Sequence, residues 1–598
     1  MPKEKQTGDA PQTLSSSKYI LIILSLAIAV IVYCFWAFPY RALLSYREQF
    51  QLFQTTGTYF SDLASRPGGI AIYIGEFLTQ FFNNFWIGAA VITGLMLLFL
   101  LLCYFLINRF APTITKITKF TLSLIPFISI WMLYGNPDVT FCFLTALLIA
   151  IATAYAYISS NGNNSTSAAE RYLKMAVVTA LVYWLAGHTT IVFTLLIVGY
   201  ISKSPNISIT NKLFFALLSL VWLAANVAIW SYSLPYPLSY QLIGIGYLMT
   251  PDKLYAVVLI VELLTMLVPY AAAFIGQRPL KIVVPTLIAL ELLAIVILFP
   301  KAYDKTTHRL IDYDYMVRAN NWNGIIKASD KHIPDLPLTV SATNLALGMT
   351  EQLDSRAFDY YQNGVEGLLP PFAKEPLSSW TTGEIFFQLG MINSAQRFYF
   401  EGMEAIPNYN KSSRAIKRLA ETAMIRGDYP LAEKYLHLLE NTLFYKKWAQ
   451  RNLALIKTPD GVESHPLYGS LRKRMINEDY LFSEGELDKT LGQLYLKDFG
   501  NNLAKQYLIL YPLLQRDLNK FGQYMGVVTE SQSQYNPLLA QQAVAFISMK
   551  NGQPVPSNIV PPMVEQSLRS FAQAWTSKNP ELIAPHRRTL YYYLLSNE

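Results

Sequence analysis

The chain has 598 residues, a formal net charge of +8, and a composition that is 52% hydrophobic and only 15% charged. This length predicts more than one domain, and the apolar composition excludes a single soluble globular protein of this size. Many basic residues lie in short segments between apolar runs, which is typical of membrane orientation and excludes a concentrated nucleic-acid-binding face.

Apolar runs fill the first 300 residues and predict a polytopic helical membrane domain at 19–300. After a polar tail at 1–18, the run at 19–38 is long enough to cross a bilayer. It lacks the small-residue cleavage site of a signal peptide, so we interpret it as a retained anchor. With it, the sequence predicts nine spans, the others being 85–107, 120–134, 141–158, 174–187, 190–201, 213–230, 254–275 and 281–299.

The stretch 174–201 has two interpretations, one long span or a hairpin that turns at Gly187-His188-Thr189. With nine spans and a cytoplasmic N-terminus, the outer loops carry only Arg41, Arg47, Arg66 and Lys253 as basic residues. Merging the two spans would move Lys203, Lys212, Arg278 and Lys281 outside, against the positive-inside rule. The hairpin is therefore favoured, and residues 301–598 are predicted to lie outside the cytoplasm.

The first outer loop, residues 39–84, is too polar for a span and too amphipathic for a plain linker. A first helix is predicted from an apolar stripe at helical spacing, formed by Leu43, Tyr46, Phe50 and Phe53. After a turn signal at Arg66-Pro67-Gly68-Gly69, a second helix has an apolar face formed by Ile70, Ile74, Phe77 and Phe81. This periodicity predicts two helices lying in the membrane interface.

Carboxylates of the outer loops are the candidate catalytic groups. Glu48, Asp62 and Glu76 lie in the first loop, and Asp138 ends the short second loop. A carboxylate at the membrane surface can act as a general base or hold a divalent metal that bridges phosphates. The alternative is that these groups are solvated interface charges or helix caps. We take Glu48 and Asp138 as the catalytic candidates and Glu76 as a substrate-binding candidate.

Arginines of the first loop are candidate phosphate ligands. Arg41, Arg47 and Arg66 have no topological reason to lie outside, and guanidinium groups bind phosphate oxygens in pairs. A lipid-linked donor would present its phosphates at this depth. The alternative is that the arginines extend to lipid headgroups.

Two further candidates lie in the later outer loops. His188 is either a site residue or a hydrogen-bonding residue of the turn. Tyr236, in the aromatic fourth loop, either stacks on sugar rings or anchors in the interface. Glu262 and Glu291 lie within spans, where acids are costly and are functional candidates. No basic residue in any span offers them a partner, which disfavours a transporter.

Residues 301–598 show helical periodicity and resemble tetratricopeptide repeats in two stretches. In the first, the matching small and aromatic positions are Gly383, Gly390, Ala395, Tyr399, Gly402 and Pro407. In the second they are Ala420, Gly427, Tyr429, Ala432 and Leu436. This pattern predicts an α-solenoid but does not show what it binds. A protein partner is expected to bind through these repeats.

Two family resemblances follow from these stretches. YREQFQLFQTTGTYF, RPGGIAIYIGEFLTQFF and NLALGMTEQLDSRAFDYYQNG resemble a family of Bacteroidota multi-pass membrane proteins with a helical-repeat C-terminus. That resemblance implies a Gram-negative inner membrane with a periplasmic C-terminal domain. The architecture also resembles the GT-C glycosyltransferases, which implies acidic site residues at Glu48 and Asp138. The usual family pattern is a paired acid, whereas Glu48 is flanked by Arg47 and Gln49.

The sequence therefore predicts an all-α protein, a membrane domain followed by a tetratricopeptide-like domain. The function expected is a GT-C-like transferase that uses a lipid-phosphate-linked sugar. It would act at the periplasmic face of the inner membrane, and its membrane domain would contact the lipid bilayer. A divalent metal is one option as cofactor. The alternative function is a non-catalytic envelope-assembly or secretion-complex subunit with a periplasmic scaffold. The chain contains no P-loop, Rossmann fingerprint, HExxH motif or nucleophile elbow, and nucleic acid is not expected as a partner.

Overall fold

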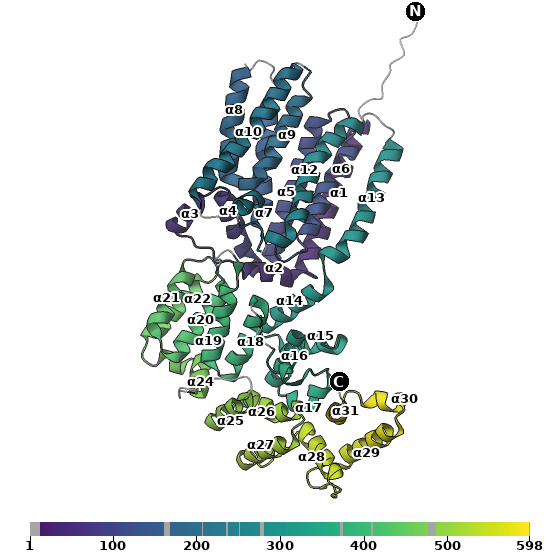
Figure 1. Ribbon diagram of the computed structural model, residues 1–598, viewed down its shortest axis with the longest axis vertical. Helices are drawn as coiled ribbons and strands as arrows, with labels where there is room; N and C mark the ends of the chain where they lie inside the picture. Colours follow the sequence, from purple (N-terminus) through teal and green to yellow (C-terminus); the bar gives the residue numbers. More distant parts are fainter. Residues whose placement is uncertain are drawn as a thin grey trace, which may run out of the picture. The chain divides into compact units, whose positions relative to one another are not determined.

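The computed structural model describes residues 12–160, 168–205, 207–234, 237–244, 246–249, 251–275, 280–370, 373, 375–407, 411–476 and 486–596. Throughout these ranges every regular element is a helix, which confirms the all-α prediction (Figure 1). One isolated antiparallel bridge joins Val139 to Leu248. The chain divides into two units. Unit 1 comprises residues 1–308 with 407–410 and 441–444, and unit 2 comprises 309–406, 411–440 and 445–598.

Unit 1 is a bundle of long apolar helices. They are α1 (Gln12–Ala37), α5 (Phe85–Phe110), α6 (Lys116–Leu133), α7 (Cys142–Ser160), α8 (Ala168–Ala186), α9 (Thr190–Ser202), α10 (Ile209–Ser233), α12 (Pro251–Ile275) and α13 (Leu280–Ala302), with a short α11 (Leu238–Ile243). Among the described residues, eight candidate spans are long and apolar enough to cross a membrane. The number of candidate spans is one fewer than the nine predicted, because the predicted spans at 174–187 and 190–201 fall within one stretch, Ala168–Lys203.

In the structure, the stretch Ala168–Lys203 is interrupted by a 3-10 turn, η2 (Gly187–Thr189). The Tyr157 hydroxyl at the end of α7 donates to the carbonyl of Arg171, near the start of α8. The Thr189 hydroxyl donates to the carbonyl of Ala146, near the start of α7, and the Phe193 ring then lies 6.1 Å from the Tyr157 ring. α8 therefore runs antiparallel to α7 and α9 runs back along it. The chain reverses at η2, as the hairpin interpretation requires.

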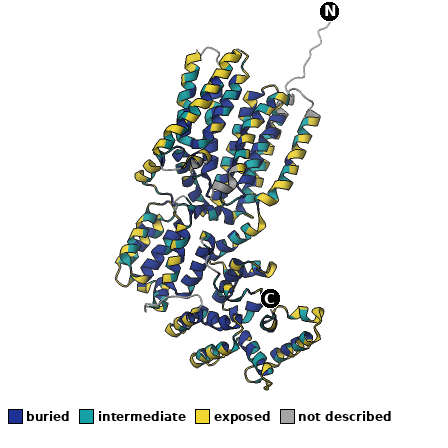
Figure 2. Ribbon diagram, viewed as in Figure 1, coloured by how far each residue is buried: buried dark blue, intermediate teal, exposed yellow. Residues whose placement is uncertain are grey.

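Many residues on the outward sides of these helices are exposed (Figure 2). Ile23 of α1, Leu213 of α10 and Val296 of α13 are among the exposed large hydrophobic residues. A helix that presents aliphatic side chains all round is typical of a membrane span, because lipid is as apolar as the protein interior. The apolar composition of unit 1 thus explains why its segments form helices and why apolar side chains remain exposed on them.

The first loop contains three α-helices rather than the two predicted: α2 (Arg41–Glu48), α3 (Gly57–Ala64) and α4 (Gly69–Thr79), followed by η1 (Gln80–Asn83). α2 is buried on most sides instead of lying in an interface. α4 has the predicted amphipathic character, since Ile74 and Phe77 are exposed whereas Glu76 is buried, as is Gln80 at the start of η1. Its polar side therefore packs into the protein.

Unit 2 consists of shorter helices, the first of which begins in the last residues of unit 1. They are α14 (Lys305–Arg318), α15 (Trp322–Lys331), α16 (Pro337–Met349), α17 (Leu353–Arg356), α18 (Pro376–Leu389), α19 (Ile392–Glu404), α20 (Ser413–Arg426), α21 (Tyr429–Glu440), α22 (Lys446–Lys457), α23 (Gly461–Ser464), α24 (Pro466–Arg474), α25 (Leu487–Lys497), α26 (Asn502–Leu514), α27 (Leu518–Ser531), α28 (Leu538–Lys550), α29 (Pro562–Ser577), α30 (Pro580–Ile583) and α31 (Leu590–Leu595). Three 3-10 segments, η3 (Ala357–Asp359), η4 (Gly364–Gly367) and η7 (Ala584–His586), complete the described elements.

The two stretches with repeat-like spacing form the helix pairs α18/α19 and α20/α21. A Cβ at Gly383 would lie 2.9 Å from the Tyr399 ring, and one at Gly402 would lie 2.7 Å from Nε1 of Trp380. These two glycines therefore allow α18 and α19 to pack closely. Gly390 follows α18 with φ +93°, a left-handed conformation that ends the helix.

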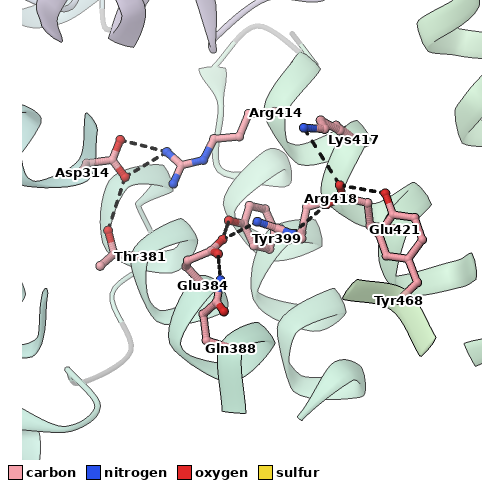
Figure 3. A network of polar contacts seen from close by, with 10 residues as sticks. All are labelled: Asp314, Thr381, Glu384, Gln388, Tyr399, Arg414, Lys417, Arg418, Glu421 and Tyr468. Carbon is pink, nitrogen blue, oxygen red and sulfur yellow. Dashed lines mark hydrogen bonds and ion pairs between the residues drawn. The ribbon is translucent and has the colours of Figure 1, made fainter. Parts of the chain in front are cut away.

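A network of buried charged residues joins the helices of unit 2 (Figure 3). Arg414 Nη1 donates to both carboxylate oxygens of Asp314, at 2.9 and 2.8 Å. Arg418 binds Glu384 at 2.7 Å and Glu421 at 2.7 Å. Burial alone would raise the pKa of Glu384, but the charge of Arg418 holds it below its usual value. Each buried carboxylate here therefore has a guanidinium beside it.

Candidate functional site

Four loops meet at the end of unit 1 where α1 ends. We call residues 38–84, 134–141, 187–189, 244 and 246–249 the four-loop junction. The Thr140 amide donates to the carbonyl of Tyr247 at 3.1 Å, and the Met249 amide donates to that of Asp138 at 2.8 Å. The Gly68 amide donates to the carbonyl of Trp184 at 2.9 Å, just before the third loop. Backbone hydrogen bonds thus join the second loop to the fourth, and the first loop to the chain just before the third.

Two glycines permit the closest approach within the junction. Gly68 has φ +75° and Gly187 has φ +58°. A Cβ at Gly68 would lie 3.3 Å from Cα of Gly187 and 2.9 Å from the Tyr247 hydroxyl, which donates to the carbonyl of Ala186. Only glycine combines the left-handed conformation with this spacing at little cost. The predicted turn signal at residues 66–69 therefore marks a tight contact between the first and third loops.

Arg47 is buried and binds the second loop. Its Nη2 donates to the carbonyls of Tyr134 at 2.6 Å and Asn136 at 2.8 Å, and its Nε donates to that of Val139 at 3.3 Å. Burial lowers the pKa of Arg47 to about 10. A cation at the C-terminal end of α6 satisfies carbonyls that have no helical partner. The structure therefore gives Arg47 a role in holding the second loop, and phosphate binding at Arg47 stays a prediction.

The other predicted residues near α2 differ in their access to solvent. Glu48 is only 4% exposed, so a carboxylate that we predicted at the membrane surface is enclosed by protein. Asp138 is half-buried, and its charge partly opposes the lowering of the Arg47 pKa that burial causes. Arg41 is exposed, with its guanidinium 5.7 Å from the centre of the Phe85 ring. The structure thus places Asp138 near enough to Arg47 for its charge to act there, whereas Arg41 is exposed.

Glu76 lies in a second polar cluster with Tyr59 and Arg66. The Tyr59 hydroxyl donates to the Glu76 carboxylate, and Gln51 Nε2 donates to the Glu76 carbonyl at 3.1 Å. Burial raises the pKa of Glu76 to about 7, although the Tyr59 hydrogen bond and the half-buried Arg66 charge oppose this rise. Glu76 can therefore gain or lose a proton near neutral pH, a property suited to acid–base chemistry.

His188 makes a contact with an acid of a span that sequence reasoning missed. Its Nε2 lies 3.0 Å from the carboxylate of Glu262 in α12, and the two side chains are 6% and 4% exposed. Nδ1 of His188 is buried and has no hydrogen-bond partner in the described part of the chain. The available signal was that His188 is the only histidine in the first 300 residues, facing spans that contain few acids. A buried acid within a span thus has its partner in the third loop.

Two further predictions are the substrate-binding role of Tyr236 and the optional divalent metal. Tyr236 lies outside the described residues. Within those ranges, no three or more His, Cys, Asp or Glu side chains lie close enough together to hold a metal ion.

Comparison with known proteins gives one match. A family model described as a family of unknown function, DUF6057, matches residues 16–597. No curated protein and no solved structure matches the chain. Because the match runs through both units and nearly the whole sequence, the chain belongs to the family of unknown function DUF6057.

Proposed function

We propose that this protein is a membrane-bound transferase of the GT-C type. It would move a sugar or oligosaccharide from a lipid-phosphate carrier to an acceptor at the four-loop junction. The single observation that carries the proposal is the convergence of the four loops, which gathers Asp138, Glu76, Arg66 and His188 at one end of the apolar bundle. A donor anchored in the bilayer would present its phosphates at that end.

The half-buried residues of the junction have distinct roles in the proposed reaction. Asp138 takes the proton from the acceptor hydroxyl as its oxygen attacks the anomeric carbon of the sugar. The bond from that carbon to the phosphate oxygen breaks, and the Arg66 guanidinium stabilises the negative charge on the leaving phosphate. Arg47 fixes the loop that carries Asp138 through three backbone carbonyls. Glu48, which is enclosed, is assigned no contact with substrate in this scheme.

The proposed orientation has the N-terminus in the cytoplasm and the junction at the periplasmic face of the inner membrane. Support comes from the end of the bundle opposite the junction, where basic side chains collect. Lys119 donates to Asn108 and the carbonyl of Pro112, and Lys203 lies 5.4 Å from the Phe110 ring centre, beside the end of α5. Positive charge at one end of the spans is typical of the cytoplasmic side. A reporter enzyme fused after Pro300 should be active in the periplasm, and cytoplasmic activity would overturn this orientation.

The catalytic proposal is tested by complementing a deletion strain. Asp138→Asn should abolish the recovery of the envelope glycan and glycoprotein profile while the protein reaches normal levels in the membrane. Asp62→Asn, which changes an exposed carboxylate of the first loop, is the matched control and should restore the profile fully. Full restoration by Asp138→Asn would exclude the transferase.

A second function, that of a non-catalytic scaffold, is supported by two observations. Arg47 is buried in the protein, and unit 2 contains closely packed helix pairs. We propose that unit 2 is a tetratricopeptide-like solenoid that binds a protein partner in the periplasm. In a purely non-catalytic envelope-assembly or secretion subunit, unit 1 would serve as the anchor. The same strain distinguishes the two functions. A scaffold retains full function with Asp138→Asn and loses it when residues 309–598 are removed while unit 1 still accumulates in the membrane.

A further inference from the structure

A cavity of about 650 Å³ lies between α1, α6 and α13. Aliphatic and aromatic side chains supply nearly all of its lining, among them Ile28, Phe127, Ile288 and Phe299. This volume falls within the range of about 300–1,000 Å³ that is typical of small-molecule sites in proteins. Because α1, α6 and α13 are all candidate membrane spans, a molecule dissolved in the bilayer can reach it from the side.

The lining contains one acid. Glu291 of α13 is only 8% exposed, and its Oε1 is buried without a hydrogen-bond partner in the described chain. The Nε1 of Trp131, also in the lining, is likewise buried and unpartnered there. By contrast, the Thr121 hydroxyl in the same cavity donates to the carbonyl of Ile117. Two polar atoms are thus left for an occupant of the cavity.

The position of Glu291 limits what that occupant can be. Glu291 is the central residue of α13, at equal sequence distance from Leu280 and Ala302. A charged headgroup at the middle of a span is costly, so the occupant is uncharged at this depth. A carboxylate left alone among apolar side chains is also costly, so the Glu291 side chain is a neutral acid that donates a hydrogen bond.

The chemistry of the cavity therefore defines one ligand class. We propose that the cavity between α1, α6 and α13 binds a neutral chain-like lipid whose hydroxyl or carbonyl oxygen accepts a hydrogen bond from Glu291. The apolar lining holds the chain, and the indole of Trp131 supplies a second donor, because an indole N–H can only donate. A plain acyl chain would fill the space but leave both donors unpaired, at an energetic cost. This site is separate from the four-loop junction and does not depend on the proposed transferase.

Photolabelling of the purified full chain in lipid nanodiscs tests the proposal. The probes are a long-chain alcohol with a diazirine in its chain and the matched hydrocarbon without the hydroxyl. The alcohol should label peptides of α1, α6 and α13 about fivefold more than the hydrocarbon does, as expected for one additional hydrogen bond. Equal labelling by the two probes would show an adventitious bilayer chain only and would overturn the proposal.

Variants of α13 test whether labelling by the alcohol depends on Glu291. Glu291→Leu should reduce labelling by the alcohol to the level of the hydrocarbon and leave the hydrocarbon unchanged. Leucine suits the apolar cavity, so this variant should fold, and its thermal midpoint provides the check. Thr286→Val, at an exposed position of the same helix, should leave both probes unaffected. Ile288→Trp should fill the cavity and lower labelling by both. Alcohol labelling that survives Glu291→Leu contradicts the proposal.

Discussion

Buried charge is stabilised differently in the two units. In unit 2, Asp314, Glu384 and Glu421 each have a guanidinium within hydrogen-bonding distance, from Arg414 or Arg418 (Figure 3). In unit 1, Arg47 is bound by backbone carbonyls and Glu76 by a tyrosine hydroxyl. The pKa shifts follow this difference. The pKa of Arg414 is raised despite its burial, because Asp314 lies beside it, whereas the pKa of Arg47 is lowered by burial.

This difference separates structural charges from candidate functional ones. A carboxylate and a guanidinium that neutralise each other have little remaining attraction for a ligand, and their removal affects stability. A buried group whose partners are neutral keeps an unbalanced charge or a shifted pKa, which is typical of functional sites. We therefore expect substitutions in the network of unit 2 to act on folding, and those at Glu76 to act on the response to pH.

The largest effect is expected from Arg414→Met. The substitution keeps the length of the side chain but leaves Asp314 buried without its guanidinium. Breaking a buried pair in this way costs about 3–5 kcal/mol of unfolding free energy. Thermal or denaturant unfolding of the full chain in detergent, followed by the loss of helical signal from unit 2, measures it.

A matched control for this substitution is Arg569→Met. Arg569 pairs with Glu565 one helical turn away on the surface, with side chains 66% and 31% exposed, so its loss should cost no more than about 0.5 kcal/mol. Asp314→Asn combined with Arg414→Met should recover part of the loss, because it removes the remaining charge. Equal effects of Arg414→Met and Arg569→Met would show that the buried network contributes nothing beyond surface pairs.

The next effect is the dependence of stability on pH at Glu76. The pKa of this carboxyl rises from an ordinary value of 4.5 to about 7 in the folded protein, so folding favours the protonated form. The stabilisation is complete below pH 4.5, decreases as the pH rises to about 7, and amounts to about 3 kcal/mol. Glu76→Gln imitates the protonated form and should be more stable than the natural protein at pH 8 but equally stable at pH 4.

Thermal midpoints measured between pH 4 and pH 8 check this expectation. Asp62→Asn is the control, because it removes an exposed carboxylate of the same loop and should leave the pH profile unchanged. If Glu76→Gln shows the same profile as the natural protein, Glu76 is not the group responsible.

The smallest of the three effects is expected from Arg47→Met. The carbonyls of Tyr134, Asn136 and Val139 lose their donor, which should cost about 2 kcal/mol of unfolding free energy. Arg47→Lys should recover little, since one ammonium cannot reproduce the planar set of donors. Arg41→Met, on the exposed side of the same helix, should change stability by no more than about 0.5 kcal/mol. An effect of Arg47→Met as small as that of Arg41→Met would contradict the structural role.

The parts of the fold that the sequence predicts are those determined by local pattern. About twenty consecutive apolar residues define each clear span, and the repeated apolar spacing at Ile70, Ile74 and Phe77 places α4 correctly. α3 was missed because GTYFSDLA has only eight residues and no repeated apolar position. Its start is fixed by Thr56, whose side chain accepts a hydrogen bond from the Tyr59 amide.

The parts that sequence reasoning missed depend on distant partners. Arg47 was expected at a surface because its acceptors are backbone carbonyls 87 to 92 residues away, and a carbonyl is present at every residue type. His188 and Glu262 are 74 residues apart, and Asp314 and Arg414 are 100 apart. No local pattern shows that such side chains will meet. The outer-loop residues were thus identified as a group, whereas their individual contacts required the structure.

The pairing of His188 with Glu262 also has a consequence for synthesis. Chains grow at about 5–20 residues per second, so the separation of 74 positions delays the appearance of Glu262 after His188 by roughly 4–15 s. During that interval the third loop relies on contacts with earlier parts of the chain, from Thr189 to Ala146 and from Gly68 to Trp184. Tyr247 and then Glu262 arrive later and complete the site. His188 is thus synthesised before Glu262, and a translational pause before α12 would lengthen the interval in which His188 lacks this carboxylate.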